Sequence, residues 1–204
     1  MSEKAINVLL GDITTIPCDV IVNAAHGHLT GGGGVDGAIH RAAGTKLVQC
    51  CQDFPFENGL RCGDGQAKIT PSFNLDSCKY IIHTVAPKFV GGLIRRTETT
   101  DGEYVTSKGV RYSKELKNNL ASKDEFLEKC YINSIALAEE NKFNSIAFPS
   151  LGTGGHAYPI EIACPIAVRT VSELLKETEY VQEVIFVTFS EKDYKAYSEV
   201  LGLL

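Results

Sequence analysis

The sequence predicts an α/β protein in which helices are layered on a sheet. Short apolar runs alternate along the chain with segments of helical periodicity, an order that is typical of α/β folds. Two glycine-rich loops, residues 31–34 (the first glycine loop) and 152–155 (the second glycine loop), each follow a strand-like run and precede a helix-like run. The 204 residues, 44% of them apolar, are enough for one domain with a sizeable core. We therefore expect a single domain over residues 1–204.

Six short apolar runs are expected to form the strands of the sheet. They are residues 5–10, 19–22, 66–70, 79–85, 145–148 and 184–189. A turn at residues 14–17 divides the first two runs. Ligands of such sheets gather where loops leave the carboxyl ends of strands, so both glycine loops should lie on the same rim.

Helical periodicity predicts four main helices, at residues 35–51, 125–140, 159–176 and 191–201. The segment at 125–140 places its apolar residues on one face, and Pro159 stands at a favoured position in the first turn of the next helix. Residues 88–124 do not follow this alternation of strand-like and helical segments and are expected to form an insertion. They contain eight Lys and Arg against five Asp and Glu, with a candidate hairpin at 102–106 and a short helix near 112–120.

Composition excludes several classes of function. The formal net charge of −5 argues against a nucleic-acid-binding surface, which needs clustered Lys and Arg. No apolar run approaches the ~20 residues of a membrane span, and residues 1–5 show no apolar signal region. The seven cysteines form no CxxC pair, and their odd number indicates reduced thiols in the cytoplasm or nucleus. Four of them are expected to be small core residues, namely Cys18, Cys78, Cys130 and Cys164.

The first glycine loop points to an anion-binding site. Four consecutive glycines cost backbone entropy, and the usual reason for them is a close approach of backbone amides to a phosphate at a helix N-terminus. Asp36 stands where this loop becomes a helix, an unusual neighbour for an anion unless the carboxylate takes part in chemistry. Neither loop is a P-loop motif, and the second glycine loop lacks the spacing of a nicotinamide-binding Rossmann motif. Together they suggest a diphosphate gripped from both sides with no metal required.

Several ordered segments resemble the macrodomain family, most closely its MacroD-type branch. They are residues 11–14, 23–25, 31–44, 67–71, 82–85, 148–154 and 158–159. The resemblance covers nearly the whole chain except the insertion. It implies a three-layer α/β/α sandwich on a mixed, roughly six-stranded sheet, which binds ADP-ribose in a surface cleft without a cofactor. It also implies that the partner is ADP-ribose or an ADP-ribosylated protein. A monomer is expected, although the sequence does not determine the oligomeric state.

The resemblance also assigns roles to individual residues. Asp12 would receive the adenine amino group and Phe189 would stack on the adenine, although Asp12 could instead cap a turn and Phe189 could be a core aromatic. The two glycine loops would lie against the diphosphate and the distal ribose. The full set of expected ligand-binding residues is Asp12, Ile13, Asn23, Gly32, Gly33, Gly34, Val35, Gly152, Thr153, Gly154, Gly155, His156 and Phe189.

Asp36 matches the catalytic aspartate of the MacroD-type branch. The resemblance implies an ADP-ribosyl hydrolase that removes mono-ADP-ribose from acidic side chains, deacetylates O-acetyl-ADP-ribose, or both, with Asp36 positioning the water. Asp36 could instead serve only as a favourable acid at a helix N-terminus. A phosphatase acting on ADP-ribose-1″-phosphate would use the same cleft.

Two histidines depart from the family pattern. His26 stands where the family has an asparagine that contacts the distal ribose, so it could replace that contact, act as an acid or base beside Asp36, or leave a binding module without activity. His156 replaces an aromatic residue, and the second glycine loop is more like that of macrodomains that read the mark. We therefore count His26 with Asp36 as a catalytic candidate and keep the non-catalytic reader as the alternative.

The other histidines are expected to be structural. His40, one helical turn after Asp36, could touch it, but packing within the helix is the favoured interpretation. His83 lies within an apolar strand and is expected to be a hydrogen-bonded core residue. A metal site built from His26, His28 and Cys50 or Cys51 has no standard zinc spacing, so no metal ligand is predicted.

Overall fold

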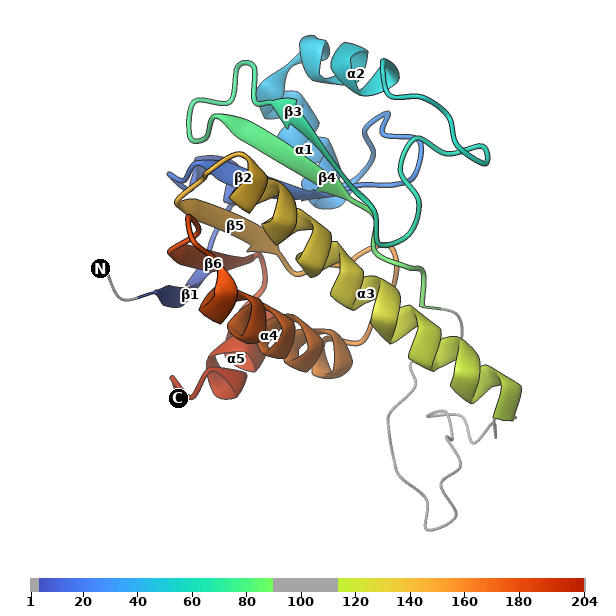
Figure 1. Ribbon diagram of the computed structural model, residues 1–204, viewed down its shortest axis with the longest axis vertical. Coiled ribbons are helices and arrows are strands. Elements are labelled where there is room, and N and C mark those ends of the chain that lie inside the picture. Colours follow the sequence, from blue (N-terminus) through green and yellow to red (C-terminus); the bar gives the residue numbers. More distant parts are fainter. Residues whose placement is uncertain (1–3, 90–113, 204) are drawn as a thin grey trace.

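The computed structural model describes residues 4–89 and 114–203 and is built on one six-stranded sheet (Figure 1). The strand order is β1-β6-β5-β2-β4-β3; β3 runs antiparallel to β4, and all other neighbours are parallel. This confirms the expected mixed sheet. The strands are β1 (Ala5–Leu10), β2 (Val20–Ala24), β3 (Ala67–Pro71), β4 (Tyr80–Thr84), β5 (Ser145–Pro149) and β6 (Glu183–Thr188).

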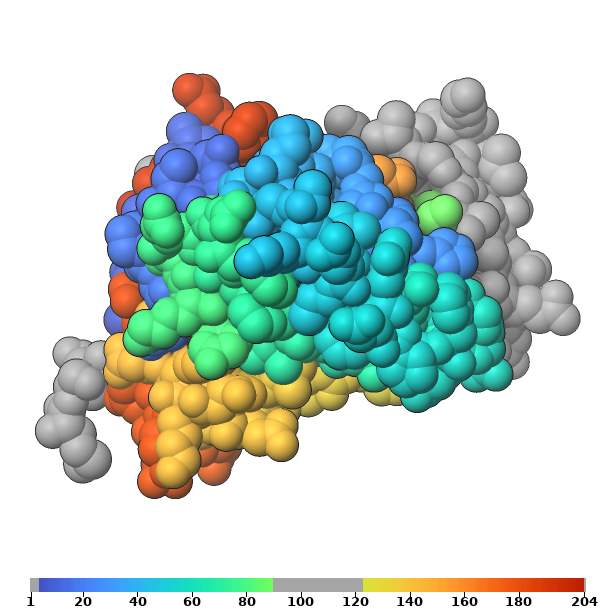
Figure 2. Space-filling model, turned by 90° about the horizontal axis from the view of Figure 1, so that it is seen from above, coloured from blue at the N-terminus to red at the C-terminus, as the bar shows by residue number. Residues whose placement is uncertain are grey.

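Helices cover both faces of this sheet. On one face, α1 (Gly34–Ala43) and α2 (Thr45–Gln52) share a hydrophobic cluster with strand residues such as Ile21 and Ile81. On the other face lie α3 (Lys114–Glu140), α4 (Ile160–Glu177) and α5 (Glu191–Val200). A short 3-10 helix, η1 (Ile13–Thr15), follows β1. Figure 2 looks onto the side of α1 and α2, in blue to cyan. The arrangement is the expected three-layer sandwich.

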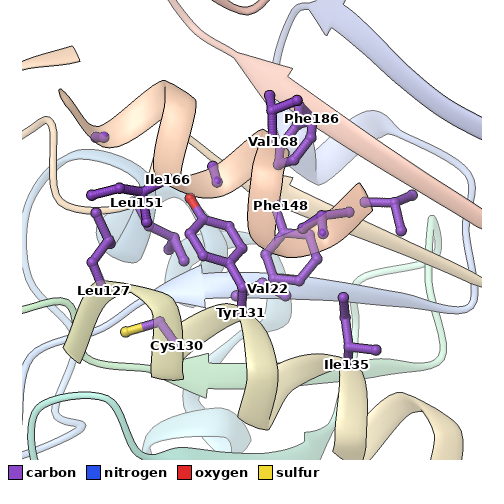
Figure 3. Close-up of a cluster of buried hydrophobic side chains, with 14 of the residues drawn as sticks. Val22, Leu127, Cys130, Tyr131, Ile135, Phe148, Leu151, Ile166, Val168 and Phe186 are labelled. Atoms are coloured by element: carbon purple, nitrogen blue, oxygen red, sulfur yellow. The ribbon is translucent and has the colours of Figure 1, made fainter. Parts of the chain in front are cut away.

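The period-2 geometry of the strands explains the two cores. Val22 and Phe148 point to the α3–α5 side, where they meet Tyr131 of α3 and Ile166 of α4 (Figure 3). Ile21 belongs to the cluster on the opposite side of the sheet. The rings of Tyr131 and Phe148 are 5.1 Å apart. Among the cysteines, Cys78, Cys130 and Cys164 are buried as expected and Cys18 is partly buried; all seven are free thiols. No helix among the described residues is long and apolar enough to cross a membrane.

The predicted helix at residues 35–51 is in fact two helices, and this is a correction. Gly44 separates α1 from α2 with a φ of 81°, a left-handed conformation that ends a helix and favours glycine. Its N–H closes the last turn of α1 on the carbonyl of His40. A Cβ at Gly44 would also lie 2.7 Å from the Asn74 side chain. The break between α1 and α2 is therefore caused by Gly44, which lies within a continuous helical pattern of apolar residues.

The long helix α3 corrects a second boundary. The sequence predicted separate helices near residues 112–120 and at 125–140, whereas one continuous helix spans Lys114–Glu140. The hairpin predicted at 102–106, and with it most of the expected insertion, lies outside the described residues.

Candidate functional site

A cleft of about 820 Å³ opens at the carboxyl ends of the five parallel strands. The segment after each of these strands reaches the cleft wall: residues 11–13 after β1, Ala25 after β2, Ala86 after β4, Ser150 and residues 152–156 after β5, and Phe189 after β6. The size is that of a typical small-molecule site. The expectation that both glycine loops share one rim is confirmed.

Both residues predicted to hold the adenine, Asp12 and Phe189, line the cleft. Phe189 lies just past β6 and is 87% exposed, so the alternative of a core aromatic is wrong. Asp12 also lines the cleft, beside Ile13. Its Oδ1 accepts hydrogen bonds from the backbone N–H and the hydroxyl of Thr14, at 2.9 and 2.8 Å. Asp12 therefore caps η1 and still faces the cleft, and the two interpretations of this residue are compatible.

The first glycine loop brings the N-terminus of α1 to the cleft. Gly33, Gly34 and Val35 line it, and Gly33 is the N-cap, without a side chain to satisfy the free N–H groups of the first turn. Such a terminus favours an anion. Gly34, Ala38 and Arg41 line the cleft at i, i+4 and i+7 of the same helix, so they form one face of α1. Sequence reasoning missed Arg41, although this helical spacing could have found it.

The second glycine loop forms the opposite wall. Gly152, Thr153, Gly154, Gly155 and His156 all line the cleft, as expected. The loop is held by backbone hydrogen bonds, from Tyr158 N–H to the Gly152 carbonyl and from Ala157 N–H to the Gly154 carbonyl, both 2.9 Å long. His156 Nδ1 lies 2.6 Å from the backbone carbonyl of Ala86, so this nitrogen carries the proton and donates it. His156 thus ties the segment after β5 to the segment after β4.

Asp36 lies behind the wall formed by the first glycine loop and is only 5% exposed. Asn23 Nδ2 donates to its Oδ1 at 2.7 Å, and His40 Nε2 lies 3.3 Å from the same oxygen. The favoured interpretation of His40 as a purely packing residue is therefore wrong. The second oxygen, Oδ2, points to the loop, because a Cβ at Gly32 would lie 3.0 Å from it. Asn23, Gly32 and Asp36 stand next to the cleft and not among the residues that line it.

The Asp36 carboxylate is held in its ionised form. Burial raises its pKa, but the contacts with His40 and Asn23 and the nearby imidazoles of His40 and His26 outweigh burial, so its pKa lies below the ordinary value. The contact with His40 is an ion pair when His40 is protonated and is not aligned as a hydrogen bond. Asp36 is therefore a fixed anion at neutral pH, suited to accepting hydrogen bonds from a bound water.

His26 lies close to Gly32, as Asp36 does. A Cβ at Gly32 would lie 3.8 Å from Cδ2 of the His26 ring. The ring's Nε2 is 3.4 Å from the Thr30 hydroxyl, and its Nδ1 is buried without a partner among the described residues. His26 does not line the cleft, but it is close enough to Asp36 to influence the carboxylate's charge.

Within the described part of the chain, one group could supply three ligands to a metal ion: His40, Cys51 and His83, with ligand atoms within 4.8 Å of one another. The set weighed from the sequence, His26 and His28 with Cys50 or Cys51, is not brought together there. Both ring nitrogens of His83 already have protein partners, and burial raises the pKa of the Cys51 thiol to about 12. A metal would have to displace these contacts and remove that proton.

Comparison with known proteins agrees with this architecture. The Macro domain family matches residues 22–108 and 96–167 of the chain. A macro domain-containing protein of Chlorobaculum tepidum is 40% identical over 197 residues, covering 97% of this chain and 95% of the relative. An O-acetyl-ADP-ribose deacetylase of Escherichia fergusonii is 39% identical over 199 residues, covering 98% and 96%.

Two solved structures show the same fold. The Oceanobacillus iheyensis macrodomain with ADP has a TM-score of 0.78 and 37% identity, covering 96% of this chain and 89% of that one. The Trypanosoma brucei macrodomain in complex with ADP-ribose has a TM-score of 0.74 and 30% identity, covering 97% and 69%. The two glycine loops, the strand order and these similarities lead to one conclusion: the chain belongs to the macro domain family.

Proposed function

We propose that this protein is an ADP-ribosyl hydrolase that deacetylates O-acetyl-ADP-ribose, removes mono-ADP-ribose from acidic side chains, or does both. The observation that carries the proposal is Asp36. Its carboxylate is ionised, anchored through one oxygen, and directed through the other toward Gly32 beside the anion-binding wall of the cleft. A binding module has no need for a fixed carboxylate next to a bound diphosphate, because the two charges repel each other.

The cleft supports ADP-ribose as the common part of the substrate. An exposed aromatic ring and an acid lie at one end, and two amide-rich loops face each other across the middle. Relatives about 40% identical carry the name O-acetyl-ADP-ribose deacetylase, and similar solved macrodomains contain ADP or ADP-ribose. In both candidate reactions water attacks an ester of the distal ribose, so the same carboxylate would serve both.

In this mechanism the chain holds the reactants in place. We propose that amides of the two glycine loops and Arg41, which line the cleft, bind the diphosphate and so hold the distal ribose within reach of Asp36. Asp36 accepts a hydrogen bond from the attacking water and orients it. A carboxylate with a lowered pKa is a weak base, so its main contribution is position and charge. We expect this assistance to be worth about 10² to 10⁴ in rate.

The test uses Asp36→Ala beside the isosteric Asp36→Asn. Release of acetate from O-acetyl-ADP-ribose, and of ADP-ribose from a protein modified on acidic residues, should fall about 10²-fold or more in both variants. Calorimetric affinity for ADP-ribose should stay the same or rise, because a repulsive charge is gone. ADP-ribose-1″-phosphate is assayed in parallel, since a phosphatase would use the same cleft. Turnover equal to that of the unaltered protein would refute the mechanism.

A non-catalytic ADP-ribose reader is the second candidate, and His26 favours it. The imidazole occupies the position of the family's asparagine, close to Asp36, and its buried Nδ1 has no partner among the described residues. A reader would bind ADP-ribose without turnover. If His26→Asn then gained hydrolysis, the histidine would be the group that disables the site. Turnover by the unaltered chain would exclude this candidate.

A further inference from the structure

The Asn23 side chain forms a link between Asp36 and the strand β4. Its Nδ2 lies 2.7 Å from Asp36 Oδ1 and 3.1 Å from Nδ1 of His83. Asn23 and His83 are both completely buried, and their backbones pair across β2 and β4. The position of the carboxylate therefore depends on a side chain of the central sheet, and not on the glycine loop alone.

The proton positions in this chain of contacts follow from the charge on Asp36. A carboxylate only accepts hydrogen bonds, so Asn23 must turn its NH₂ group and not its oxygen toward Asp36. That NH₂ group also faces His83 Nδ1, which must then accept its second hydrogen. The proton of the neutral imidazole is left on Nε2, where it can be donated to the Thr70 hydroxyl at 3.0 Å; Cys51 Sγ lies 3.8 Å from the same nitrogen.

A protonated His83 would break this arrangement. It would present an N–H to the NH₂ group of Asn23, where two donors would face each other. Burial keeps the ring neutral by lowering the pKa of His83 to about 3, assisted by the nearby His40. The tautomer with the proton on Nε2 is therefore the one that suits Asp36, Asn23 and Thr70 across the neutral pH range.

We propose that His83 is a positioning residue, which as its Nε2-H tautomer holds the Asn23 amide in the orientation that fixes the Asp36 carboxylate. This inference deepens the hydrolase function proposed above and rests on it for its effect on turnover. The tautomer itself is a property of the protein without substrate. It can therefore be tested whatever the reaction proves to be.

The first experiment records the ¹⁵N chemical shifts of the His83 ring between pH 5 and 8. We expect an unprotonated Nδ1 and a protonated Nε2 throughout, with no titration. A protonated Nδ1 would overturn the proposal. Zn²⁺ and a chelator are added in separate samples. If either one shifts these resonances, His83 serves a metal site with His40 and Cys51 instead, and the proposal also fails.

The second experiment compares two amide substitutions of similar size. His83→Asn keeps an acceptor at the position of Nδ1, whereas His83→Gln keeps a donor near the position of Nε2 and loses the acceptor facing Asn23. We expect turnover within about threefold of the unaltered protein for His83→Asn and a loss of about tenfold for His83→Gln. ADP-ribose affinity should be unchanged in both, because His83 does not line the cleft.

The outcomes separate positioning from general stability. Equal losses in the two variants, in step with their melting temperatures, would overturn the proposal. If neither variant folds, Thr70→Val replaces them. Loss of the Thr70 hydroxyl as an acceptor should move the His83 ring proton partly to Nδ1 and lower turnover. An unchanged tautomer with unchanged turnover would contradict the inference. If Asp36→Ala retains full turnover, the hydrolase proposal fails while the ¹⁵N result still decides the tautomer.

Discussion

The two glycine loops face the same cleft but are supported in different ways. Behind the first loop lie Asp36, Asn23 and His83, a buried polar chain that continues into the central sheet. The second loop is held by backbone hydrogen bonds 2.9 Å long and by the contact of His156 Nδ1 with the Ala86 carbonyl. The first loop is backed by buried polar side chains of the sheet, and the second is held mainly by contacts of the backbone.

The different supports of the two loops suit different tasks, binding of a phosphate in one case and orientation of a water in the other. Holding a phosphate needs only N–H groups directed at it, and a loop with few side-chain contacts can supply them. Orienting a water needs a carboxylate fixed within a fraction of an ångström, which requires a packed and hydrogen-bonded support. We therefore expect substitutions behind the first loop to affect turnover and stability, and substitutions near the second loop or at the nucleobase end to affect affinity.

The largest effect is expected for Gly37→Ala, at the start of α1. A Cβ there would lie 2.4 Å from the backbone carbonyl oxygen of Gly32, so the first loop and the helix must move apart. We expect unfolding to become easier by about 1–3 kcal/mol, as in other overpacked sites. Because a shift of about 1 Å can cost about 10² in rate, turnover should fall by a similar factor. Chemical denaturation and steady-state kinetics measure the two effects.

Gly155→Ala is the matched control in the second loop. Its Cβ meets only open space, so the free energy of unfolding should change by less than about 0.5 kcal/mol. Equal destabilisation by Gly37→Ala and Gly155→Ala would contradict the proposed difference in how the two loops are supported. Equal losses of turnover would likewise show that the loops do not differ in kind.

The polar chain behind the first loop also predicts how stability depends on pH. An unfolded histidine binds a proton below about pH 6.5, whereas folded His83 remains neutral down to about pH 3. The unfolded state therefore binds more protons in this window, and His83's contribution makes unfolding easier by about 1.4 kcal/mol for each pH unit below 6.5. Asp36 acts in the same direction, but only below the ordinary aspartate pKa.

Denaturation curves at pH 7, 6 and 5 for the unaltered protein and for His83→Asn isolate this contribution. The variant should be less stable at pH 7, but its stability should decline less steeply with falling pH, so that the two stabilities converge. If the stabilities of the two proteins fell in parallel with pH, folded His83 would titrate normally. Water would then reach the polar side chains behind the first loop despite their burial.

At the end of the cleft where we propose that the nucleobase binds, we expect a loss of affinity without a loss of turnover. Phe189 is 87% exposed, so Phe189→Ala should leave the free energy of unfolding nearly unchanged. Stacking of a base on an aromatic ring is worth about 1–3 kcal/mol, so ADP-ribose should bind about tenfold more weakly. Turnover at saturating substrate should be retained. A large loss of turnover at saturation would show that this end of the cleft also positions the reacting ester.

The sequence predicts the architecture well because two of its features are local: the alternation of strand-like and helical segments, and the glycines in the loops between them. All six strands lie near their predicted positions, and both glycine loops meet at one rim, as parallel strands require. The errors have local causes as well. Gly44 was absorbed into the periodicity of one long helix, although its left-handed conformation ends α1.

The candidate site was predictable where motif residues face the cleft directly. Asp12, Phe189 and the second glycine loop all do so. The environment of Asp36 was not predictable, because Asn23 and His83 come from two strands that pair only in the folded sheet. The contact with His40 was visible as an i, i+4 spacing, but the spacing alone could not distinguish it from packing. Arg41 was hidden in the same way, within a helix whose orientation toward the cleft is a tertiary property.

Arg41 gives the smallest predicted effect and tests the cleft's electrostatics. It is exposed on the α1 face that lines the cleft, in a protein whose net charge is −5, so any attraction for the diphosphate from this side chain is local. An exposed ion pair is worth up to about 1 kcal/mol, so Arg41→Gln should weaken ADP-ribose binding about threefold. The effect should shrink between 0.05 and about 0.5 M salt as screening shortens the range of the interaction. Lys46→Gln, which removes the same charge from α2 outside the cleft, should leave affinity unchanged at both salt concentrations. Equal effects of the two substitutions would show that affinity follows net charge and that α1 presents no specific cation to the phosphates.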